Sequence, residues 1–534
     1  MNKKILFNLL FLTLPILGNC QLINVIPYPQ EVIKLEGYNT LSLDVKLSSD
    51  PIFDSEVTYL ANILKKEYEV SPKIVKKEAD ISLKLNNKIE KNEAYYLHVN
   101  DSCIIIEAKD KSGAFYAIQS LRQLIKKVDN SFIIQRCKIK DFPVLKWRAF
   151  MLDEARYFKG EQVVKQILDE MANLKMNVFH WHLTDDQGWR VEIKKYPLLT
   201  EIGGRRDSSQ IEWYESCKYD GIKHEGFYTQ EQIRNIVSYA SERHITIVPE
   251  IEMPGHCAAA VASYPWLGTT GKIIKVPCKF GVHKEAFNVA NPDVLKFIQD
   301  VINEIIILFP SKVIHIGGDE VVYDQWNSSK EIQRFIKDKG LTSSPDLQVW
   351  FTNWISIIIN NKGKRMAGWN DITGKQLHNF QKENDSKIKL APNTIIQFWK
   401  GDTDLILNTI SAGYDIINSF NEMTYLNYSY QYDSLQSTYD FKPIPLSKAY
   451  NFSPIPDKIP SDKRKHIIGA GCQMWGEWIP NEESMNYMIY PRIAAYAETF
   501  WTIPEKKNYP RFKENLNTLL LKWKYTGIKF GPID

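Results

Sequence analysis

Eight short apolar runs that alternate with amphipathic stretches constrain the fold of this chain more than any other feature of its sequence. The runs begin after Trp147, and each is short and apolar enough to form a buried strand. Strands that alternate with helices in this way are typical of a closed barrel of parallel strands. We therefore predict the α/β class and a (β/α)8 TIM barrel. The predicted strands are Arg148–Leu152, Asn177–Trp181, Thr246–Pro249, Val313–Ile316, Arg365–Gly368, Ile395–Phe398, Asp415–Ile417 and Ile468–Cys472, and the predicted helices are Gln162–Leu174, Gln230–Arg243, Pro292–Leu308, Pro345–Asn361 and Asp402–Ala412.

The residues before the barrel form a different pattern. A chain of 534 residues is too long for one ordinary domain. We predict a small α+β domain over residues 21–143, with helices on one face of an antiparallel sheet, and a barrel with a C-terminal helical tail over residues 144–534. Asp141-Phe142-Pro143 marks the boundary. The strands expected in the first domain are Ile81–Leu85, Tyr95–Val99 and Cys103–Ala108, and its helices are Ser55–Tyr68 and Lys111–Lys127.

The first 20 residues have the composition of an export signal. Lys3 and Lys4 precede an apolar stretch from Ile5 to Leu17 that is too short to span a bilayer durably. The following Leu17-Gly18-Asn19-Cys20 also resembles a bacterial lipobox, in which the cysteine receives a lipid. Simple secretion and a lipid anchor on Cys20 are both compatible with this pattern. In either case we expect an exported protein, in the periplasm, at the cell surface or secreted.

Charge and cysteine content narrow the function further. The net charge of +4 is small for this length, and no long basic block is present, so we do not expect nucleic acid as a partner. Six cysteines follow Cys20 without the C-x-x-C spacing of a zinc site. One or two disulfides would be compatible with export, and Cys257 and Cys278 are the most local pair.

Polar and aromatic residues follow the predicted strands, where a barrel places its active site. Because the carboxyl ends of all the strands meet at one face of the barrel, we expect these side chains to converge. Each could separately be a solvated loop residue, but random loops would not supply such a set. The set is Asp153, Arg156, His182, Asp185, Asp186, Glu250, Glu252, His256, Asp319, Glu320, Trp369, Asn370, Asp371, Trp399, residues 418–425, Trp475 and Glu477.

The segment His315-Ile316-Gly317-Gly318-Asp319-Glu320 carries the most specific chemistry. Ordinary glycosidases place two carboxyl groups on opposite sides of the scissile bond. Asp319 and Glu320 are neighbours, and adjacent side chains diverge in extended chain, so we expect them to do different work. If Glu320 protonates the leaving oxygen, Asp319 can act on a 2-acetamido group of the same sugar. The acetamide oxygen would then be the nucleophile.

Several ordered motifs resemble glycoside hydrolase family 20, the β-N-acetylhexosaminidases. The resemblance covers nearly the whole chain after the export signal and implies a retaining, exo-acting hydrolase of terminal β-linked N-acetylglucosamine or N-acetylgalactosamine. It implies neither a metal nor another cofactor. The motifs are Ile26-Pro27-Tyr28-Pro29, Leu152-Asp153-Glu154-Ala155-Arg156, the run from His180 to Arg190, the run from Pro249 to His256, the run from His315 to Glu320, Gly368-Trp369, Gln397-Phe398-Trp399, Tyr425-Leu426-Asn427, Met474-Trp475-Gly476-Glu477, Pro491-Arg492 and Ala497-Glu498.

The resemblance also assigns roles to single residues. Asp319 orients the acetamide, and Glu320 is the general acid and base. Among the substrate-binding residues, Arg156 and Glu477 bind sugar hydroxyls, and Tyr425 donates to the acetamide oxygen. Trp369, Trp399 and Trp475 line the acetamido pocket, and Asn427 stands where family members carry Asp or Asn. His256 and Asp185, with His182 beside them, form an outer group that tunes Glu320.

Two other functions compete with this prediction. His180-x-His182 imitates the ligand pair of metal-dependent hydrolases built on the same barrel, although the later strands offer indoles where such enzymes need further ligands. A surface glycan-binding protein without activity would lack Asp319 or Glu320, and both are present. Apart from glycans, we expect contact with a membrane only through a lipid on Cys20.

Overall fold

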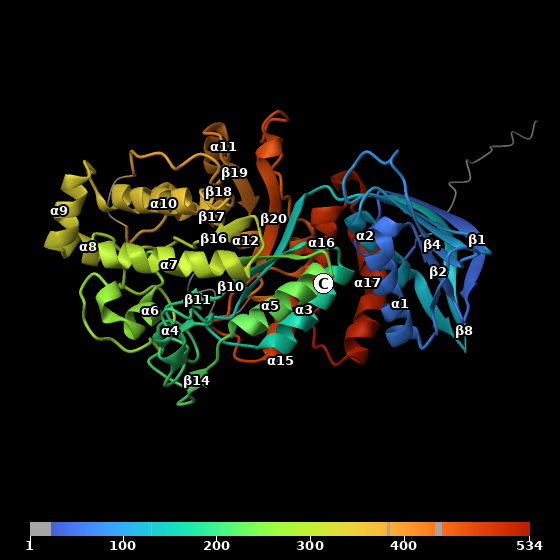
Figure 1. Ribbon diagram of the computed structural model, residues 1–534, viewed down its shortest axis with the longest axis horizontal. Helices are drawn as coiled ribbons and strands as arrows, with labels where there is room; N and C mark the ends of the chain where they lie inside the picture. The colour runs from blue at the N-terminus through green and yellow to red at the C-terminus, as the bar shows by residue number, and fades with distance from the viewer. Residues whose placement is uncertain (1–22, 130, 382–384, 433–440) are drawn as a thin grey trace, which may run out of the picture.

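The computed structural model describes residues 23–129, 131–381, 385–432 and 441–534. The expected export signal, including Cys20, lies outside these residues. Two bodies lie side by side: a barrel surrounded by helices, and a smaller domain built on a sheet (Figure 1). No helix among the described residues combines the length and the apolar character needed to cross a membrane.

The eight predicted barrel strands are all present, and they close into a ring in which every pairing is parallel. This result confirms the predicted TIM barrel. Most predicted boundaries differ from the observed ones by one or two residues, as expected where a strand frays into a loop. The strands are β9 (Trp147–Asp153), β10 (Val178–His182), β15 (Thr246–Glu250), β16 (Val313–His315), β17 (Arg365–Trp369), β18 (Ile395–Phe398), β19 (Asp415–Asn418) and β20 (Ile467–Met474).

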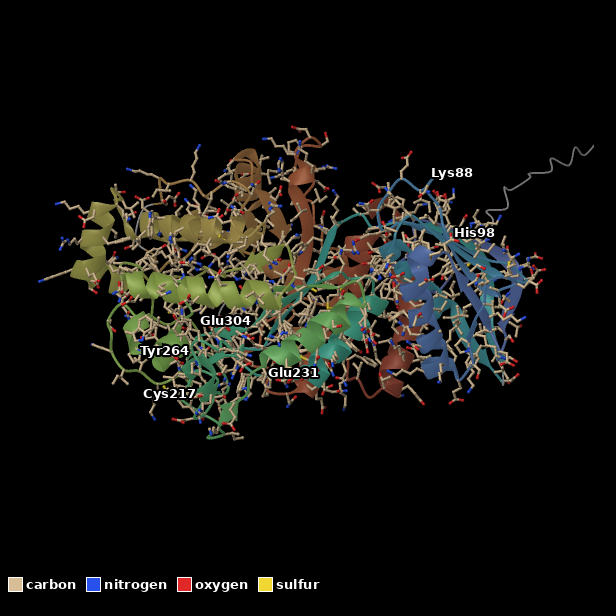
Figure 2. The ribbon with its side chains drawn as sticks, in the orientation of Figure 1. Lys88, His98, Cys217, Glu231, Tyr264 and Glu304 are labelled. Atoms are coloured by element: carbon tan, nitrogen blue, oxygen red, sulfur yellow. The ribbon has the colours of Figure 1, made fainter. Side chains whose placement is uncertain are left out.

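The five predicted barrel helices are also present, and side-chain caps fix where several of them begin. Thr229 and Gln232 form a reciprocal capping box, and Asn291, Ser343 and Asp402 each accept a hydrogen bond from a backbone N–H of the first turn. Glu304 in α7, which is labelled in Figure 2, accepts from Gln230 Nε2 and thereby ties two neighbouring helices together. The helices are α3 (Glu161–Asn173), α5 (Gln230–Ser241), α7 (Pro292–Leu308), α10 (Ser344–Asn360) and α11 (Thr403–Ser411), followed by α16 (Arg492–Trp501) and the C-terminal α17 (Tyr509–Tyr525).

Two connections depart from the strict alternation of strand and helix. Between β17 and β18 the described chain contains only the 3-10 helix η3 (Asn370–Thr373), and between β19 and β20 it contains only short helices such as α14 (Leu446–Tyr450). The five predicted helices all lie in other connections, so the structure agrees with the sequence at these two places. Both connections bring residues to the mouth of the barrel.

The barrel interior changes from apolar to polar along its axis. At one level an apolar cluster draws a side chain from every strand, including Val178, Val248 and Val313. Closer to the carboxyl ends, His180, Glu250 and His315 replace apolar residues and remain buried. A packed apolar layer below and a polar layer above are the arrangement that a rigid catalytic barrel requires.

The N-terminal domain has the predicted helices but not the predicted sheet. Its sheet follows the order β1-β8-β5-β6-β4-β2-β3, and only the half that contains β1, β8, β5 and β6 is antiparallel. In the other half β6, β4, β2 and β3 pair in parallel, because helix α1 returns the chain to the same end of the sheet after β2. The strands are β1 (Glu31–Leu41), β2 (Lys46–Ser49), β3 (Lys73–Ile74), β4 (Ile81–Leu85), β5 (Tyr95–Val99), β6 (Ile104–Ala108), β7 (Ile125–Val128) and β8 (Ser131–Asp141), and the helices are α1 (Asp54–Tyr68) and α2 (Lys111–Leu124).

Helix α2 lies between the sheet and the barrel and is buried along most of its length. Its predicted end at Lys127 is wrong, because residues 125–128 form β7 and pair with β8. At this junction Lys175 Nζ lies 2.9 Å from Asp141 Oδ2, and both side chains are completely buried. The two domains are therefore joined by a buried ion pair as well as by apolar contacts.

The cysteines of the described residues do not pair. Cys257 and Cys278, the most local pair in the sequence, are both free, and so are the other four that follow Cys20. Cys257, Cys137 and Cys472 are buried, and Cys217 is exposed on the segment between β13 (Arg205–Arg206) and β14 (His224–Glu225) (Figure 2). The disulfides that the sequence left open do not form among these six cysteines.

Candidate active site

Two glycines turn the chain at the end of β16 so that the two acids enter the barrel mouth. Gly317 and Gly318 both have positive φ, at 64° and 86°. A Cβ on Gly317 would lie 1.8 Å from Glu252 Oε2, so no other residue fits there without moving that carboxylate. The backbone N–H of Gly318 donates to the same oxygen at 3.2 Å. The glycines therefore leave room for the Glu252 carboxylate next to the turn that carries the acidic pair.

Asp319 and Glu320 do not diverge as extended chain would require. Glu320 adopts φ +50°, in the left-handed region. Both carboxyl groups consequently approach one ring nitrogen: His256 Nε2 is 3.9 Å from Asp319 Oδ2 and 3.6 Å from Glu320 Oε2. The geometric premise behind their different roles is wrong. Their surroundings still differ, because the Asp319 side chain is 11% exposed and that of Glu320 is 24% exposed.

Burial and neighbouring acids alter the titration of Asp319. Loss of water raises its pKa to about 7, and the charges of Asp371 and Glu320 add to this effect against the opposing His256. Asp319 Oδ1 is buried and accepts no hydrogen bond within the described part of the chain. A buried acceptor without a donor is costly, and a ligand N–H would satisfy it.

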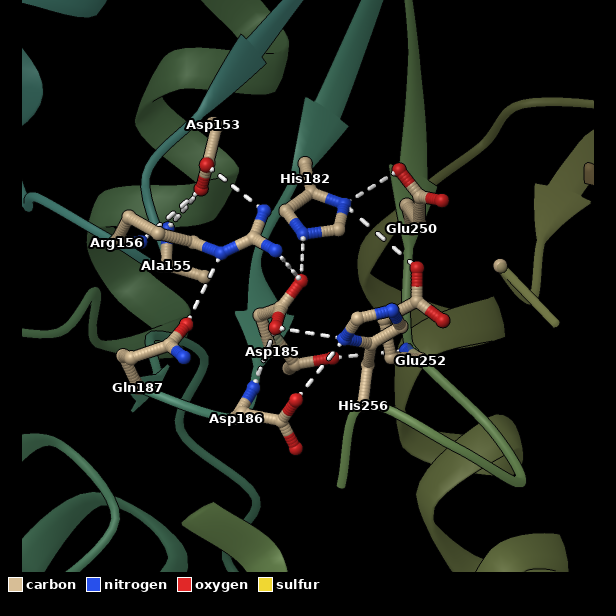
Figure 3. A network of polar contacts seen from close by, with 12 residues as sticks. Asp153, Ala155, Arg156, His182, Asp185, Asp186, Gln187, Glu250, Glu252 and His256 are labelled. Carbon is tan, nitrogen blue, oxygen red and sulfur yellow. Dashed lines mark hydrogen bonds and ion pairs between the residues drawn. The ribbon is translucent and has the colours of Figure 1, made fainter. Parts of the chain in front are cut away.

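His256 lies between the acidic pair and two further carboxylates, those of Asp185 and Asp186, which Figure 3 shows beside the imidazole. Its Nδ1 lies 3.2 Å from Asp185 Oδ1 and 3.0 Å from Asp186 Oδ2. Burial alone would lower the pKa of His256, but these acids outweigh it and hold the pKa well above the usual range. A cationic imidazole therefore faces Asp319 and Glu320.

Arg156 is fixed from three sides. Its guanidinium is 3.0 Å from Asp153 Oδ2 and 2.9 Å from Asp185 Oδ2, and its Nε donates to Gln187 Oε1 at 3.1 Å (Figure 3). The guanidinium also lies 5.2 Å from the centre of the Trp475 ring. These contacts pre-orient a forked donor at the wall of the cavity.

Glu250 organises the layer beneath. Its Oε2 is 2.7 Å from His182 Nδ1 and 2.9 Å from His180 Nε2, and its Oε1 accepts from Trp369 Nε1 at 2.6 Å. His182 Nε2 is in turn 3.0 Å from Asp185 Oδ2. Burial lowers the pKa of His182, but Glu250 and Asp185 outweigh it and raise the pKa to about 10. His180 and His182 thus face an internal carboxylate, and neither lines the cavity. This position weakens the competing interpretation, a metal-dependent hydrolase with these two histidines as ligands.

Aromatic rings form the walls above this layer. Trp399 and Tyr425 are nearly parallel, with centroids 6.1 Å apart, and Tyr425 lies 5.9 Å from Trp475. Trp369 packs against Trp475 with ring centroids 5.7 Å apart, but it is not among the residues that line the cavity. Three of the four rings therefore bound the space directly, and Trp369 supports one of them.

The cavity between these groups has a volume of about 250 Å³. Glu477 borders it, and its Oε1 accepts a hydrogen bond from Tyr214 at 3.4 Å. The structure brings together ten predicted residues there: Arg156, His256, Asp319, Glu320, Trp399, Asn421 from the segment 418–425, Tyr425, Asn427, Trp475 and Glu477. His182, Asp185 and Trp369 lie behind this lining.

Sequence reasoning did not identify Tyr214, Lys400, Tyr428 and Phe441, which also border the cavity. Lys400 directly follows Trp399, so its position after β18 was a usable signal. Tyr214 and Phe441 come from long connections far from any strand end, and no pattern in the sequence marks them.

Comparisons with known proteins agree with this geometry. Residues 145–504 match the model of the glycosyl hydrolase family 20 catalytic domain, and residues 22–142 match that of family 20 domain 2. The chain is 33% identical to a beta-hexosaminidase of Porphyromonas gingivalis, over 95% of this chain and 64% of that relative. It is 34% identical to a beta-hexosaminidase of Vibrio furnissii, over 89% of this chain and 76% of the relative. The chain thus spans about two thirds of the length of the first of these relatives.

Solved structures show the same likeness. An exo beta-N-acetylglucosaminidase of Vibrio harveyi, solved in complex with N-acetylglucosamine, superposes with a TM-score of 0.83 at 31% identity, over 95% of this chain and 78% of the other. A beta-N-acetylhexosaminidase of Bacteroides fragilis gives 0.82 at 31% identity, over 95% and 97%. With the catalytic-domain match spanning most of the barrel, the chain belongs to glycosyl hydrolase family 20.

Proposed function

We propose that this protein is an exo-acting β-N-acetylhexosaminidase that removes terminal β-linked N-acetylglucosamine or N-acetylgalactosamine from glycans with retention of configuration. One observation carries the proposal. Asp319 places a buried oxygen, for which the described residues supply no donor, at the wall of an aromatic cavity, beside the more exposed carboxyl of Glu320. An acetamide N–H meets the first group, and a glycosidic oxygen meets the second.

The reaction follows from these positions. The acetamide carbonyl oxygen attacks the anomeric carbon, the glycosidic bond breaks, and Glu320 gives its proton to the leaving oxygen. Positive charge develops on the acetamide nitrogen, and the Asp319 carboxylate stabilises it in a site that largely excludes water. Water then opens the oxazolinium ring as Glu320 takes back a proton. Two displacements on one carbon retain the β configuration.

The remaining lining residues hold the sugar. The oriented guanidinium of Arg156 suits vicinal hydroxyls, and Glu477 accepts from hydroxyls at the same end of the cavity. Trp475 offers an aromatic face to the ring, and Tyr425 stands beside it as a donor for the acetamide oxygen. Asn427 borders the same space. Trp369 supports Trp475 from behind.

Hydrolysis of chromogenic 2-acetamido and plain β-glucosides by the wild-type protein tests the function. We expect cleavage of the 2-acetamido substrate, no cleavage of the plain glucoside, and competitive inhibition by a thiazoline that mimics the cyclised intermediate. Efficient cleavage of the plain glucoside would contradict the mechanism. Binding of N-acetylglucosamine without any hydrolysis would favour the glycan-binding alternative.

We also propose that the protein is exported and that Cys20 is lipidated. The charged, apolar and lipobox-like segments of residues 1–20 support this proposal. Growth of the producing cells with labelled palmitate tests it. Label on the wild-type chain and none on Cys20→Ala would support the anchor, whereas unlabelled protein in the medium would support simple secretion.

A further inference from the structure

A second histidine faces the general acid from the side opposite His256. His378 belongs to the β17–β18 connection, the one that lacks a long helix among its described residues, and it is only 4% exposed. Its Nδ1 lies 3.5 Å from Glu320 Oε1, whereas His256 Nε2 lies 3.6 Å from Glu320 Oε2. Each oxygen of the Glu320 carboxyl therefore has an imidazole nitrogen beside it.

Each of these two imidazoles is held by acids on its far side. His378 Nε2 is 2.7 Å from Asp371 Oδ1, just as His256 Nδ1 is bound by Asp185 and Asp186. Asp371 also accepts from the backbone N–H of Glu320 at 3.2 Å and from Trp399 Nε1 at 2.8 Å. One carboxylate thus fixes His378, the backbone of the general acid and an aromatic wall of the cavity.

The ring of His378 is well constrained. It stacks on Phe380 with centroids 4.9 Å apart and an interplanar angle of 16°, and it lies 5.6 Å from Trp399. Because Asp371 accepts at Nε2, this nitrogen carries a hydrogen in either protonation state. Only Nδ1 changes when the ring takes up a proton.

The protonation of Nδ1 decides whether His378 can accept a hydrogen bond from Lys400. Its ammonium lies 3.2 Å from His378 Nδ1 and can only donate, so this contact requires a neutral ring. A protonated ring would instead point an N–H at Glu320 Oε1. Burial lowers the pKa of His378, but Asp371 and Glu320 outweigh both burial and Lys400 and raise it. The charged groups that face His378 are thus Asp371, Glu320 and Lys400, and those that face Glu320 from the other side are His256 and Asp319.

We propose that His378 is a positioning residue that contacts Oε1, the second carboxyl oxygen of Glu320. It stabilises the carboxylate that forms when Glu320 gives its proton to the leaving group. The ring is neutral where Nδ1 accepts from Lys400, and it becomes cationic when Nδ1 takes up a proton from solvent and donates it as a hydrogen bond to Glu320. The inference rests on the proposed role of Glu320 as general acid and base. His378 itself neither touches the sugar nor exchanges a proton with it.

The pH dependence of kcat/KM tests this role. An imidazolium stabilises a neighbouring carboxylate by charge attraction, and substitution of His378 takes that attraction away. We expect His378→Asn and His378→Phe to move the alkaline limb of the kcat/KM profile upward by roughly 1 pH unit, the scale of losing one nearby opposite charge. His378→Phe retains the stacking on Phe380 and separates the loss of the nitrogens from the loss of the ring.

His98→Asn, a histidine substitution on β5 of the other domain, is the matched control and should leave the profile unchanged (Figure 2). An alkaline limb that stays fixed in both His378 variants, while Glu320→Gln still abolishes hydrolysis of a natural linkage, would overturn the inference and leave the proposed function standing. Full activity of Glu320→Gln would instead overturn the function.

A spectroscopic measurement holds even if the His378 variants do not fold. The ten histidines can be labelled at the ring carbon and titrated by NMR in the wild type and in Glu320→Gln. Because both His256 and His378 face Glu320, two ring signals should respond, each with a titration midpoint lower in the variant. A His378 ring signal with the same titration midpoint in the wild type and in Glu320→Gln would contradict the inference.

Discussion

At the scale of the residue, the neighbouring acids have separable roles. Glu320→Gln removes the transferable proton, so turnover should fall by roughly 10²–10⁴-fold, as is usual for loss of a general acid. Substrates with phenolic leaving groups need less protonation and should lose least. Initial rates on a disaccharide and on an aryl glycoside measure the difference. Equal losses on both substrates would argue against acid catalysis by Glu320.

Ionisation of the Asp319 carboxyl should be required for activity but should lower the stability of the fold. Its carboxylate form is required for catalysis, yet the fold raises its pKa to about 7 from about 3.9 in unfolded chain. The stability that this shift contributes is complete below the unfolded pKa and is lost as pH rises through about 7. Asp319→Asn should therefore be nearly inactive but more stable than the wild type at pH 8, with a smaller advantage at pH 5. Melting temperatures at both pH values measure this, and an advantage independent of pH would contradict the assignment.

At the scale of the element, the loop after β16 depends on its glycines. Gly317→Ala forces a Cβ to 1.8 Å from Glu252 Oε2, in addition to the strain of φ +64°. We expect it to abolish activity and to lower the free energy of unfolding by more than the roughly 1–2 kcal/mol of left-handed strain alone. Gly340→Ala, with φ +69° and open space around the Cβ, is the matched control for that strain. Urea unfolding of both variants gives the comparison, and equal losses would show that the contact with Glu252 is unimportant.

The barrel strands could be predicted because each is a short run of consecutive apolar residues, and such a run indicates a buried strand without knowledge of the rest of the fold. The positions of Arg156, Asp319 and Trp475 follow from the same rule, since each comes just after a strand. His378 could not be found in this way, because it reaches Glu320 through an irregular connection and is placed by contact with Asp371. The left-handed φ of Glu320 could not be predicted either, because Asp319 and Glu320 were expected to lie in extended chain.

At the scale of the whole molecule, the two partners of the ion pair between the domains should contribute unequally to the free energy of unfolding. Asp141 accepts from Lys175, from Tyr95 and Trp501 Nε1, and from two backbone N–H groups, so Asp141→Ala strands a buried cation together with these other donors. Loss of one partner of a buried pair typically costs about 3–5 kcal/mol. Lys175→Met leaves Asp141 with its other donors and should cost less. Chemical unfolding of the two variants tests the order, and a greater loss in Lys175→Met would reverse it.

The parallel half of the N-terminal sheet shows what sequence patterns leave undetermined at this scale. Strand runs such as Ile81–Leu85 were visible, but their direction depends on where α1 returns the chain, which no local pattern records. The family resemblance extends over both domains, but it did not give the direction of these strands. The six cysteines in the described residues stay unpaired although the predicted compartment would permit disulfides.

The central claim is that the substrate's own acetamide oxygen is the nucleophile, held by Asp319. A series of aryl glucosaminides whose N-acyl group carries none, one, two or three fluorine atoms tests this claim most directly, because fluorine withdraws electrons from that oxygen and leaves the leaving group unchanged. The mechanism predicts that kcat/KM falls steeply with each added fluorine. Rates that stay level across the series would contradict it and would point to a nucleophile supplied by the protein.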